Sequence, residues 1–508
     1  MQEQIVVKID SHRSPVQTRV LLGATIKDGL VYLPSQALPS LLGLISVPIF
    51  TRIFTPDQYG QLAIVGSTVS FMLIGTAWGH ESAMRFYAAA ERDNNLPAFF
   101  GAAILSLLTT LVLIGVVGGL ILSHLPAILP REYLGFAIVI FVAEALFKQG
   151  LQLLRVAQKS VAYTTLTVSF SVAKLALSLL LVFFWRREIA SLLWAWALTD
   201  LVLVPFIAGR LSLPNHVRHA KWSSVKSYFE EFIAYGTPFV ISSGAWATLS
   251  IVDRFVIQHF RGSAEVGLYY VGSVPNLGFS FIFTLLAFAS YPIIVDTWEK
   301  AGSEPTQELI KGLLRLYFML SVPLVVGVSI LSKEIIGVLA APQYLSAYKV
   351  VPLVALGGFF QGLLPFTTKS FVLLKKPALN MAIGLVGAMS TLLLNILFIP
   401  SLGFLGAGLA MSISYLLVVA LSIVISKKVL HFSYHISLAS LGRICLGSVI
   451  IIPGVAGLSQ WCPHLNDLFG LVVKSIGGAS IYFIALLAMR EASLEDLLAL
   501  SRLLISRR

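Results

Sequence analysis

Apolar stretches long enough to cross a lipid bilayer recur along nearly the whole chain. About fourteen can be delimited, each close to the roughly 20 residues that a membrane-spanning helix requires. Hydrophobic residues make up 57% of the sequence and charged residues 12%, and the mean hydropathy is +0.87. Because the apolar runs are continuous and do not alternate with period two, they indicate helices rather than barrel strands. The sequence therefore predicts an all-α polytopic membrane protein.

The distribution of Lys and Arg predicts the orientation of these spans. An even number of spans places both termini on one side of the membrane. With the N-terminus in the cytoplasm, 24 of the 36 Lys and Arg residues lie on the cytoplasmic side and nine on the other. The positive-inside rule favours this arrangement, in the cell inner (cytoplasmic) membrane. The net charge of +12 then reflects basic loops beside anionic lipid, so that no nucleic-acid partner is needed. The predicted spans are 31–52, 62–84, 98–123, 135–156, 163–185, 190–211, 232–257, 268–291, 309–332, 348–372, 378–400, 405–426, 441–459 and 469–489.

The spans fall into two halves of six helices with two additional helices after them. A polar, basic connection after the sixth span predicts an interfacial linker, and leucines at helical spacing near the C-terminus predict an amphipathic helix. Pro238 and Pro275 predict kinks in the seventh and eighth spans. The predicted domains are a cytoplasmic tail (1–30), an N-terminal bundle (31–211), a cytoplasmic linker (212–231), a C-terminal bundle (232–426), two further helices (441–489) and a cytoplasmic amphipathic tail (490–508).

An internal repeat relates the two halves. The first span ends in VPIFTRIFTPDQYGQLAIVGS and the seventh in SIVDRFVIQHFRGSAEVGLYYVGS. Both segments have an arginine at a helix end, a short polar loop, a glycine early in the next helix and then Gly-Ser. Parallel repeats of this kind are typical of transporters, with the substrate site between the halves near the bilayer midplane. The matched positions are Arg52 with Arg254, Gly60 with Gly267, and Gly66-Ser67 with Gly272-Ser273.

At these residues the chain resembles the polysaccharide transporter family of the multidrug/oligosaccharidyl-lipid/polysaccharide flippase superfamily. The similar segments are PIFTRIFTPDQYG, GHESAMRFY, IVDRFVIQHFRGSAEVGLYYVGS and LNILFIPSLGFLGAGLAMSISYLL, in this order along the chain. The resemblance implies two pseudo-symmetric bundles that alternate between inward-open and outward-open states. It implies a flippase for polyprenyl-pyrophosphate oligosaccharide in O-antigen, capsule or exopolysaccharide assembly. Membrane lipid is a second partner, and other polysaccharide-assembly membrane proteins are a third class that the hypothesis allows.

Basic residues are the candidates for binding the pyrophosphate, because a guanidinium makes bidentate charge-assisted hydrogen bonds to phosphate. Charges within a span are costly and need a reason, and Lys174 and Arg315 have no oppositely charged neighbour on their own helix. The resemblance adds Arg52, Arg85 and Arg254. The alternatives are cross-helix ion pairs for the buried residues and snorkelling or lipid-headgroup contact for the others. The complete cationic set is Lys174, Arg315, Arg52, Arg85, Arg254, Lys148 and Lys369.

Acidic residues within the spans are the candidates for coupling transport to a proton or sodium gradient. They are Glu81, Glu144 and Asp200. Glu144 is spaced to pair with Lys148 on one helix face, and Glu81 has the same spacing from Arg85, so pure charge neutralisation is the alternative. Asp253 is a candidate gate, either through a salt bridge with Arg254 or by neutralising it. We expect no catalytic residue, no metal site and no cofactor other than the coupling ion.

Two other functions remain open from the sequence. A cation-coupled multidrug exporter of the same superfamily should favour unpaired acids in its cavity. Within these spans acids and bases balance, and the arginines expected at the cavity mouth, Arg52, Arg85 and Arg254, favour an anion. A membrane polysaccharide polymerase or transferase should carry a sizeable extracytoplasmic loop. No predicted outer loop exceeds about fifteen residues and none has paired carboxylates or a nucleophile constellation, so we expect a protein that is not an enzyme.

Overall fold

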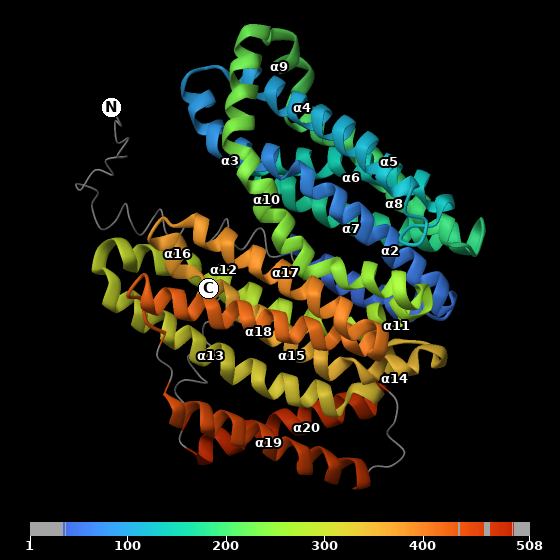
Figure 1. The fold of residues 1–508 in the computed structure, drawn as a ribbon, viewed down its shortest axis with the longest axis vertical. Helices are drawn as coiled ribbons and strands as arrows, with labels where there is room; N and C mark the ends of the chain where they lie inside the picture. The colour runs from blue at the N-terminus through green and yellow to red at the C-terminus, as the bar shows by residue number, and fades with distance from the viewer. Residues whose placement is uncertain (1–33, 36, 435–436, 462–467, 490, 492–508) are drawn as a thin grey trace.

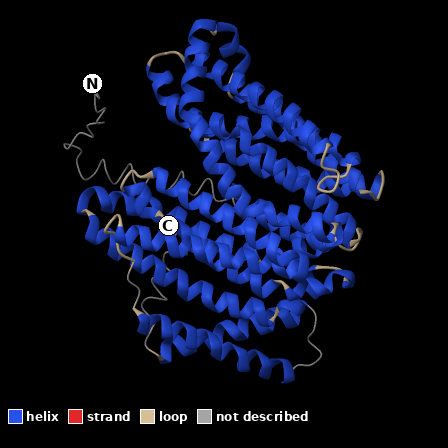
Figure 2. Cartoon of the chain, in the orientation of Figure 1, coloured by secondary structure: helices blue, strands red, loops and turns tan. Residues whose placement is uncertain are grey.

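The computed structural model describes residues 34–35, 37–434, 437–461, 468–489 and 491. Every regular element among these residues is a helix (Figures 1 and 2). Twelve helices are long and apolar enough to span a membrane, and a bent pair makes a thirteenth. The all-α polytopic architecture is confirmed, but the predicted number of fourteen spans is not. The first predicted span, 31–52, is described as a helix over Ala37–Phe50, which is short for a span, and the tail 1–30 lies outside the described residues.

The N-terminal half consists of long helices with local changes of winding. A capping box starts the first of them: Thr55 accepts from the backbone of Gln58, whose side chain accepts from the backbone of Thr55, and Pro56 occupies the first helical position. The predicted fifth and sixth spans are two separate helices, as expected. The elements are α2 (Pro56–Met72), η1 (Leu73–Thr76), α3 (Ala77–Arg92), α4 (Leu96–Val112), η2 (Leu113–Gly118), α5 (Gly119–Ser123), α6 (Arg131–Val156), α7 (Ser160–Phe184) and α8 (Ile189–Arg210).

Helix α10 (Trp222–Arg261) connects the two halves. The predicted linker 212–231 contains the short α9 (Leu213–His219) and the first turns of α10. At 1.5 Å per residue, the 40 residues of α10 extend roughly 60 Å, about twice the hydrocarbon thickness. α10 packs on α3 and α4 and also on α17 (Pro377–Leu402) and α18 (Phe404–Lys428) of the other half. This helix therefore contacts both halves, and the division of the chain into domains stays a prediction.

The C-terminal half begins with a bent span. The chain bends by 45° between α11 (Ser263–Ser273) and α12 (Asn276–Ala301), which confirms the kink predicted at Pro275. Proline lacks the amide hydrogen that would continue the helix. Besides α17 and α18, the remaining elements are α13 (Ser303–Ile330), α14 (Ser332–Leu339), η3 (Pro342–Lys349), α15 (Val351–Thr367) and α16 (Lys369–Leu373).

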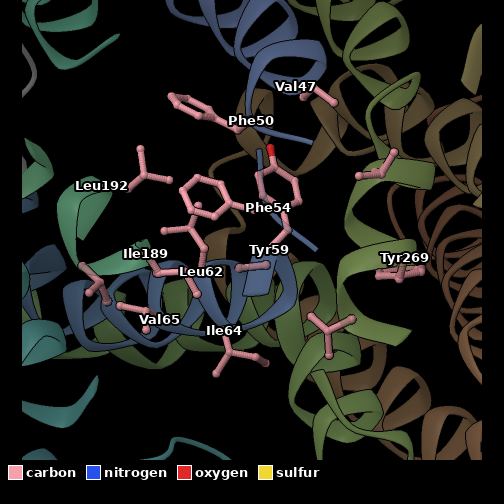
Figure 3. Close-up of a cluster of buried hydrophobic side chains, with 14 of the residues drawn as sticks. Val47, Phe50, Phe54, Tyr59, Leu62, Ile64, Val65, Ile189, Leu192 and Tyr269 are labelled. Carbon is pink, nitrogen blue, oxygen red and sulfur yellow. The ribbon is translucent and has the colours of Figure 1, made fainter. Parts of the chain in front are cut away.

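Apart from the connecting helix α10, the described residues of the two halves share a hydrophobic core at one end. One buried cluster joins Phe54, Tyr59 and Leu62 of the first half with Tyr269 of the second (Figure 3). Tyr344 of the second half belongs to the same cluster. Two other clusters are separate: one lies within the C-terminal half, and the other joins α3, α4, α6 and α8 with the beginning of α10. Accordingly the halves meet where α2 and α11 lie and diverge toward the other end (Figure 1). Under the predicted orientation, the joined end is extracytoplasmic.

The last two helices, α19 (Leu438–Trp461) and α20 (Leu468–Ala488), pack on α13. Lys474 of α20 forms an ion pair with Glu334 of α14 at 3.6 Å. Beyond α20, Glu491 is buried and accepts from Arg315 of α13 at 3.0 Å and from Arg443 of α19 at 3.1 Å. The rest of the predicted amphipathic tail 490–508 lies outside the described residues.

Loss of the Glu491 carboxylate is expected to loosen this docking in a pH-dependent way. Burial raises the pKa of Glu491, but the hydroxyl of Ser440 and the guanidinium groups of Arg315 and Arg443 outweigh it, so the net pKa is lowered. A lowered pKa in the folded state stabilises the protein above the ordinary glutamate value and loses that effect as the pH falls through the folded-state pKa. Glu491→Gln should cost about 1–3 kcal/mol at neutral pH.

The measurement is thermal unfolding of the purified protein between neutral pH and pH 3. The intact chain should lose stability in the acid range below about pH 4.3, and Glu491→Gln should lose less there. Glu308→Gln is the control, because Glu308 makes an exposed pair with Lys311. Equal melting temperatures and equal acid profiles for the intact chain and Glu491→Gln would show that this carboxylate does not hold the last helices.

Candidate substrate cavity and charged cluster

A polar cavity of about 230 Å³ lies in the C-terminal half, where α10 faces the bend between α11 and α12. Asp253 and Arg254 of α10 line it together with Tyr269 and Tyr270 of α11. At the bend the regular backbone hydrogen bonds of the helix are interrupted, so backbone polar groups that would be paired in a straight helix can face the cavity. The other lining residues are Leu249, Ser250, Ser273, Val274, Asn276, Leu277, Ser280, Val354, Gln361, Met411 and Tyr415.

Asp253 is the buried acid of this cavity, with 8% of its surface exposed. One carboxylate oxygen accepts from the hydroxyl of Tyr269 and the other from the backbone amide of Arg254 at 2.8 Å. A salt bridge between the side chains of Asp253 and Arg254 was one of the predicted gate contacts. Among the described residues, no such ion pair forms in this conformation. A second chain of hydrogen bonds links Gln361 to Tyr415 at 3.1 Å and Tyr415 to Ser250 at 3.2 Å. The cavity therefore presents oriented hydroxyl and amide groups around one carboxylate.

Arg254 reaches from the cavity to the opposite half. Its Nη1 donates to the hydroxyl of Ser67 in α2 at 3.1 Å, and its guanidinium lies 5.4 Å from the ring centre of Tyr270. Its Nε is buried and has no hydrogen-bond partner among the described residues. A guanidinium carries five donors, so Arg254 can hold Ser67 and still offer donors to an anion.

Gly358 of α15 makes room for a second polar group. A Cβ atom built on Gly358 would lie 1.7 Å from Oδ1 of Asn276. Any larger residue would therefore displace the Asn276 side chain, whose Oδ1 is buried without a hydrogen-bond partner in the part of the chain that the structure describes. Asn276 follows the proline break directly, so the bend and the glycine together place this amide at the cavity.

A second group of polar residues, here called the charged cluster, lies in the N-terminal half and comprises Glu144, Lys148, Lys174 and Asp200. The predicted pair of Glu144 and Lys148 on α6 is confirmed, with an N–O distance of 2.8 Å. The ammonium of Lys174 on α7 lies 4.3 Å from the ring centre of Trp196. α8, which carries Asp200 and Trp196, packs on both α6 and α7.

Asp200 is the most deeply buried member of the charged cluster. It is fully buried, and neither carboxylate oxygen has a hydrogen-bond partner among the described residues. Lys174, Glu144 and Lys148 are charged groups near enough to act on it electrostatically. An ionised carboxylate without hydrogen bonds is costly in a low-dielectric interior, so this position favours a neutralising cation or proton.

The other sequence-predicted residues are not brought into these two groups. Arg315, expected to face the cavity, instead pairs with Glu491 against the last two helices. Arg52 is exposed and donates to the carbonyl of Pro48, and Lys369 lies 4.7 Å from the ring centre of Tyr291. Two residues of α3 complete this set: Glu81 is half-buried, Arg85 is exposed, and no ion pair joins them within the described ranges.

The uncharged polar residues of the cavity were not predicted from the sequence. A search for charges within spans does not find Tyr269, Tyr415, Gln361 or Asn276, because tyrosine and single amides are common in apolar helices. The repeated Gly-Ser pair was the available signal, since Ser67 binds Arg254 and Ser273 lines the cavity. No group of three or more His, Cys, Asp or Glu residues that could hold a metal ion occurs in the described part of the chain.

Two family models match this chain, each over more than half of it. The model described as polysaccharide biosynthesis protein matches residues 25–298, and the model described as lipid II flippase MurJ matches residues 201–473. Together they cover the cavity, the charged cluster and the junction of the two halves. The second match includes α19 and ends within the first turns of α20.

Individual relatives are distant. The probable low-salt glycan biosynthesis flippase Agl15 of Haloferax volcanii is 23% identical over 318 residues, which are 60% of this chain and 61% of that protein. The chain spans 47% and 61% of the lengths of the first curated relatives that it matches.

The fold has solved counterparts. The structure of lipid II flippase MurJ in an inward closed conformation has a TM-score of 0.71 at 16% identity, covering 91% of this chain and 99% of that one. An inward-facing multidrug resistance MATE family transporter has a TM-score of 0.61 at 12% identity, covering 80% of this chain and 93% of that one. At these identities the likeness concerns the fold alone. The two family models show that the chain belongs to the polysaccharide biosynthesis protein family, within the superfamily of polysaccharide and lipid-linked oligosaccharide flippases.

Proposed function

We propose that this protein translocates polyprenyl-pyrophosphate-linked oligosaccharide across the cytoplasmic membrane by alternating access, for the assembly of a surface polysaccharide. Arg254 is the observation that carries the proposal. It is the motif arginine at the junction of both halves, it lines the polar cavity, and its buried Nε has no hydrogen-bond partner in the described part of the chain. A doubly anionic pyrophosphate suits such a donor, and the hydroxyl and amide groups around it suit sugars.

The shape of the protein supports a transport cycle rather than catalysis on a bound substrate. The halves share a core at one end and have separate cores toward the other. Under the predicted orientation this conformation admits the headgroup from the cytoplasm, while the polyprenyl chain stays in the bilayer. Both termini are then cytoplasmic, and the protein acts as a carrier and not as an enzyme.

The charged cluster supports ion coupling. Asp200 and Glu144 lie together in it, whereas Glu81 lies elsewhere on α3. We propose that Asp200 binds and releases a proton or a sodium ion during the cycle, with Lys174 as the competing cation. Among the acids of the sequence-predicted set, Asp200 has the strongest claim because its carboxylate has no hydrogen-bond partner among the described residues.

The test of the proposed function is the identity and location of lipid-linked intermediates in cells that lack this protein. Polyprenyl-pyrophosphate oligosaccharide should accumulate on the cytoplasmic face, surface glycan should be lost, and expression of the intact chain should reverse both. A polymerase or transferase would instead leave shorter lipid-linked glycans on the outer face.

A multidrug exporter is the second candidate, favoured by the acid Asp253 in the cavity and by the fold shared with the MATE family transporter. The same deletion distinguishes the two. Unchanged lipid-linked intermediates with increased sensitivity to cationic drugs would contradict the flippase and support the exporter.

A further inference from the structure

The repeat-related glycines Gly60 and Gly267 face each other across the junction of the two halves. A Cβ atom on Gly60 of α2 would lie 1.8 Å from the carbonyl oxygen of Ser263, and one on Gly267 of α11 would lie 2.0 Å from that of Pro56. Each contacted carbonyl belongs to the residue four positions before the opposing glycine. The contact is therefore reciprocal, and it brings the backbones of two helices together without intervening side chains.

Aromatic and polar contacts surround this glycine contact. The ring of Tyr59 lies 5.6 Å from that of Tyr270 and 6.1 Å from that of Tyr344, both edge-on. The hydroxyl of Tyr344 donates to the carbonyl of Phe54 at 2.9 Å, and Gln343 donates to the same carbonyl at 3.0 Å. α2 and the turn before it are thus held by α11 and η3, at the end where the core is common to both halves.

We propose that Gly60 and Gly267 permit the closed state at this end, and that any side chain at either position shifts the protein toward the state in which this end is open. The proposal rests on the alternating-access part of the proposed function and not on its cargo. Only the closed state brings these backbones together, so the requirement for glycine belongs to that state alone. Separation of the halves at this end removes the steric conflict.

The absence of side chains also explains how such a contact can open repeatedly. Interlocked side chains would have to change rotamers before two helices could part, whereas backbone surfaces at glycines separate without such rearrangement. Toward the opposite end, α10 alone of the second half's helices contacts the buried cluster of the first half among the described residues. A methyl group at Gly60 or Gly267 therefore raises the free energy of the closed state and leaves that of the open state unchanged.

Accessibility of a cysteine in the cavity tests the proposal. The reporter is Ser280→Cys, which lines the cavity, in a chain with both native cysteines replaced by alanine. Right-side-out and inside-out membrane vesicles are treated with a membrane-impermeant maleimide. In Gly60→Ala and in Gly267→Ala, labelling should become at least about tenfold faster in right-side-out vesicles, because a Cβ that must displace a backbone carbonyl should cost at least about 1.4 kcal/mol, and slower in inside-out vesicles.

Matched controls and a second measurement separate gating from simple destabilisation. Gly135→Ala in α6 and Gly337→Ala in α14 have open space at the new Cβ and should leave both rates unchanged. In the double variant the second substitution should add little, because both act on one contact. Unchanged labelling in both vesicle types with a lowered melting temperature would overturn the proposal, since the contact would then be permanent packing.

A cross-link gives the converse test without adding bulk at the glycines. Tyr59→Cys and Tyr344→Cys joined by a cleavable bis-maleimide should keep this end closed, abolish labelling of the reporter from the right-side-out face and recover it after cleavage. Persistent labelling in the cross-linked protein would overturn the proposal. Labelling of vesicles needs no cargo, so a negative result would contradict the role of the two glycines and not the flippase proposal. Conversely, if the protein proved to carry another cargo, the role of the glycines would be unaffected.

Discussion

Alanine in place of Arg254 should nearly abolish surface polysaccharide display while the protein remains in the membrane at its normal level. The substitution removes the guanidinium that lines the cavity and donates to Ser67. A hydrogen bond to a charged group contributes about 1.5–3 kcal/mol, so losing one such bond to pyrophosphate should slow transport by about tenfold to about 150-fold, and losing a second should slow it further. The measurement is the rate at which lipid-linked oligosaccharide reaches the outer face in cells or vesicles.

A conservative variant of Arg254 and a variant of an arginine outside the cavity provide the comparisons for this result. Arg254→Lys keeps the charge but loses the bidentate fork, so it should retain partial transport. Arg131→Ala is the matched control, because Arg131 is exposed at the start of α6, and it should transport normally. Wild-type rates for Arg254→Ala would refute the assignment of this residue to the substrate.

Arg254 also bridges the two halves, and that role needs its own variant. Ser67→Ala removes the acceptor on α2 and leaves the guanidinium in the cavity. If Arg254 acts on the substrate, Ser67→Ala should have a much smaller effect than Arg254→Ala. Equal losses in the two variants would instead mean that the bridge between the halves matters and that the substrate is bound by other groups.

The fold was largely predictable because the bilayer imposes its pattern on the sequence. Continuous apolar runs located the helices, including the pair α7 and α8, whose separation rests on a few residues. The bend at Pro275 also followed from local chemistry. The first span and the start of α10 were placed less well, because the ends of long amphipathic helices carry no sharp change of hydropathy.

The site was predictable where a local motif identified it. Arg254 and Asp253 lie in one repeated segment, and Glu144 pairs with Lys148 through helix periodicity alone. Arg315 shows the limit: its partner Glu491 is 176 residues away in the sequence and follows the last span, so no local pattern could have indicated that Arg315 is already paired. Likewise, the neutral lining of the cavity comes from five helices whose contacts are set by the tertiary fold.

Asparagine in place of Asp200 should uncouple transport from the ion gradient. The buried carboxylate has no hydrogen-bond partner among the described residues, and Lys174, Glu144 and Lys148 are the charges that act on it. An amide is nearly the same size but cannot exchange a proton or hold a cation by charge. Uptake of lipid-linked oligosaccharide into vesicles, measured with imposed proton or sodium gradients, should lose its dependence on one of them and fall by at least about tenfold.

The charges around Asp200 determine how this result is interpreted. Lys174→Gln removes the competing cation and should shift the pH or sodium dependence rather than eliminate it, whereas Glu144→Gln should have a smaller effect because Glu144 already pairs with Lys148 at 2.8 Å. Asp296→Asn is the control, since Asp296 forms a surface pair with Lys300. If Asp200→Asn, Glu144→Gln and Glu81→Gln all keep the wild-type gradient dependence, none of these acids carries the coupling ion. The buried carboxylate of Asp200 would then serve only to balance the charge of Lys174 between α7 and α8.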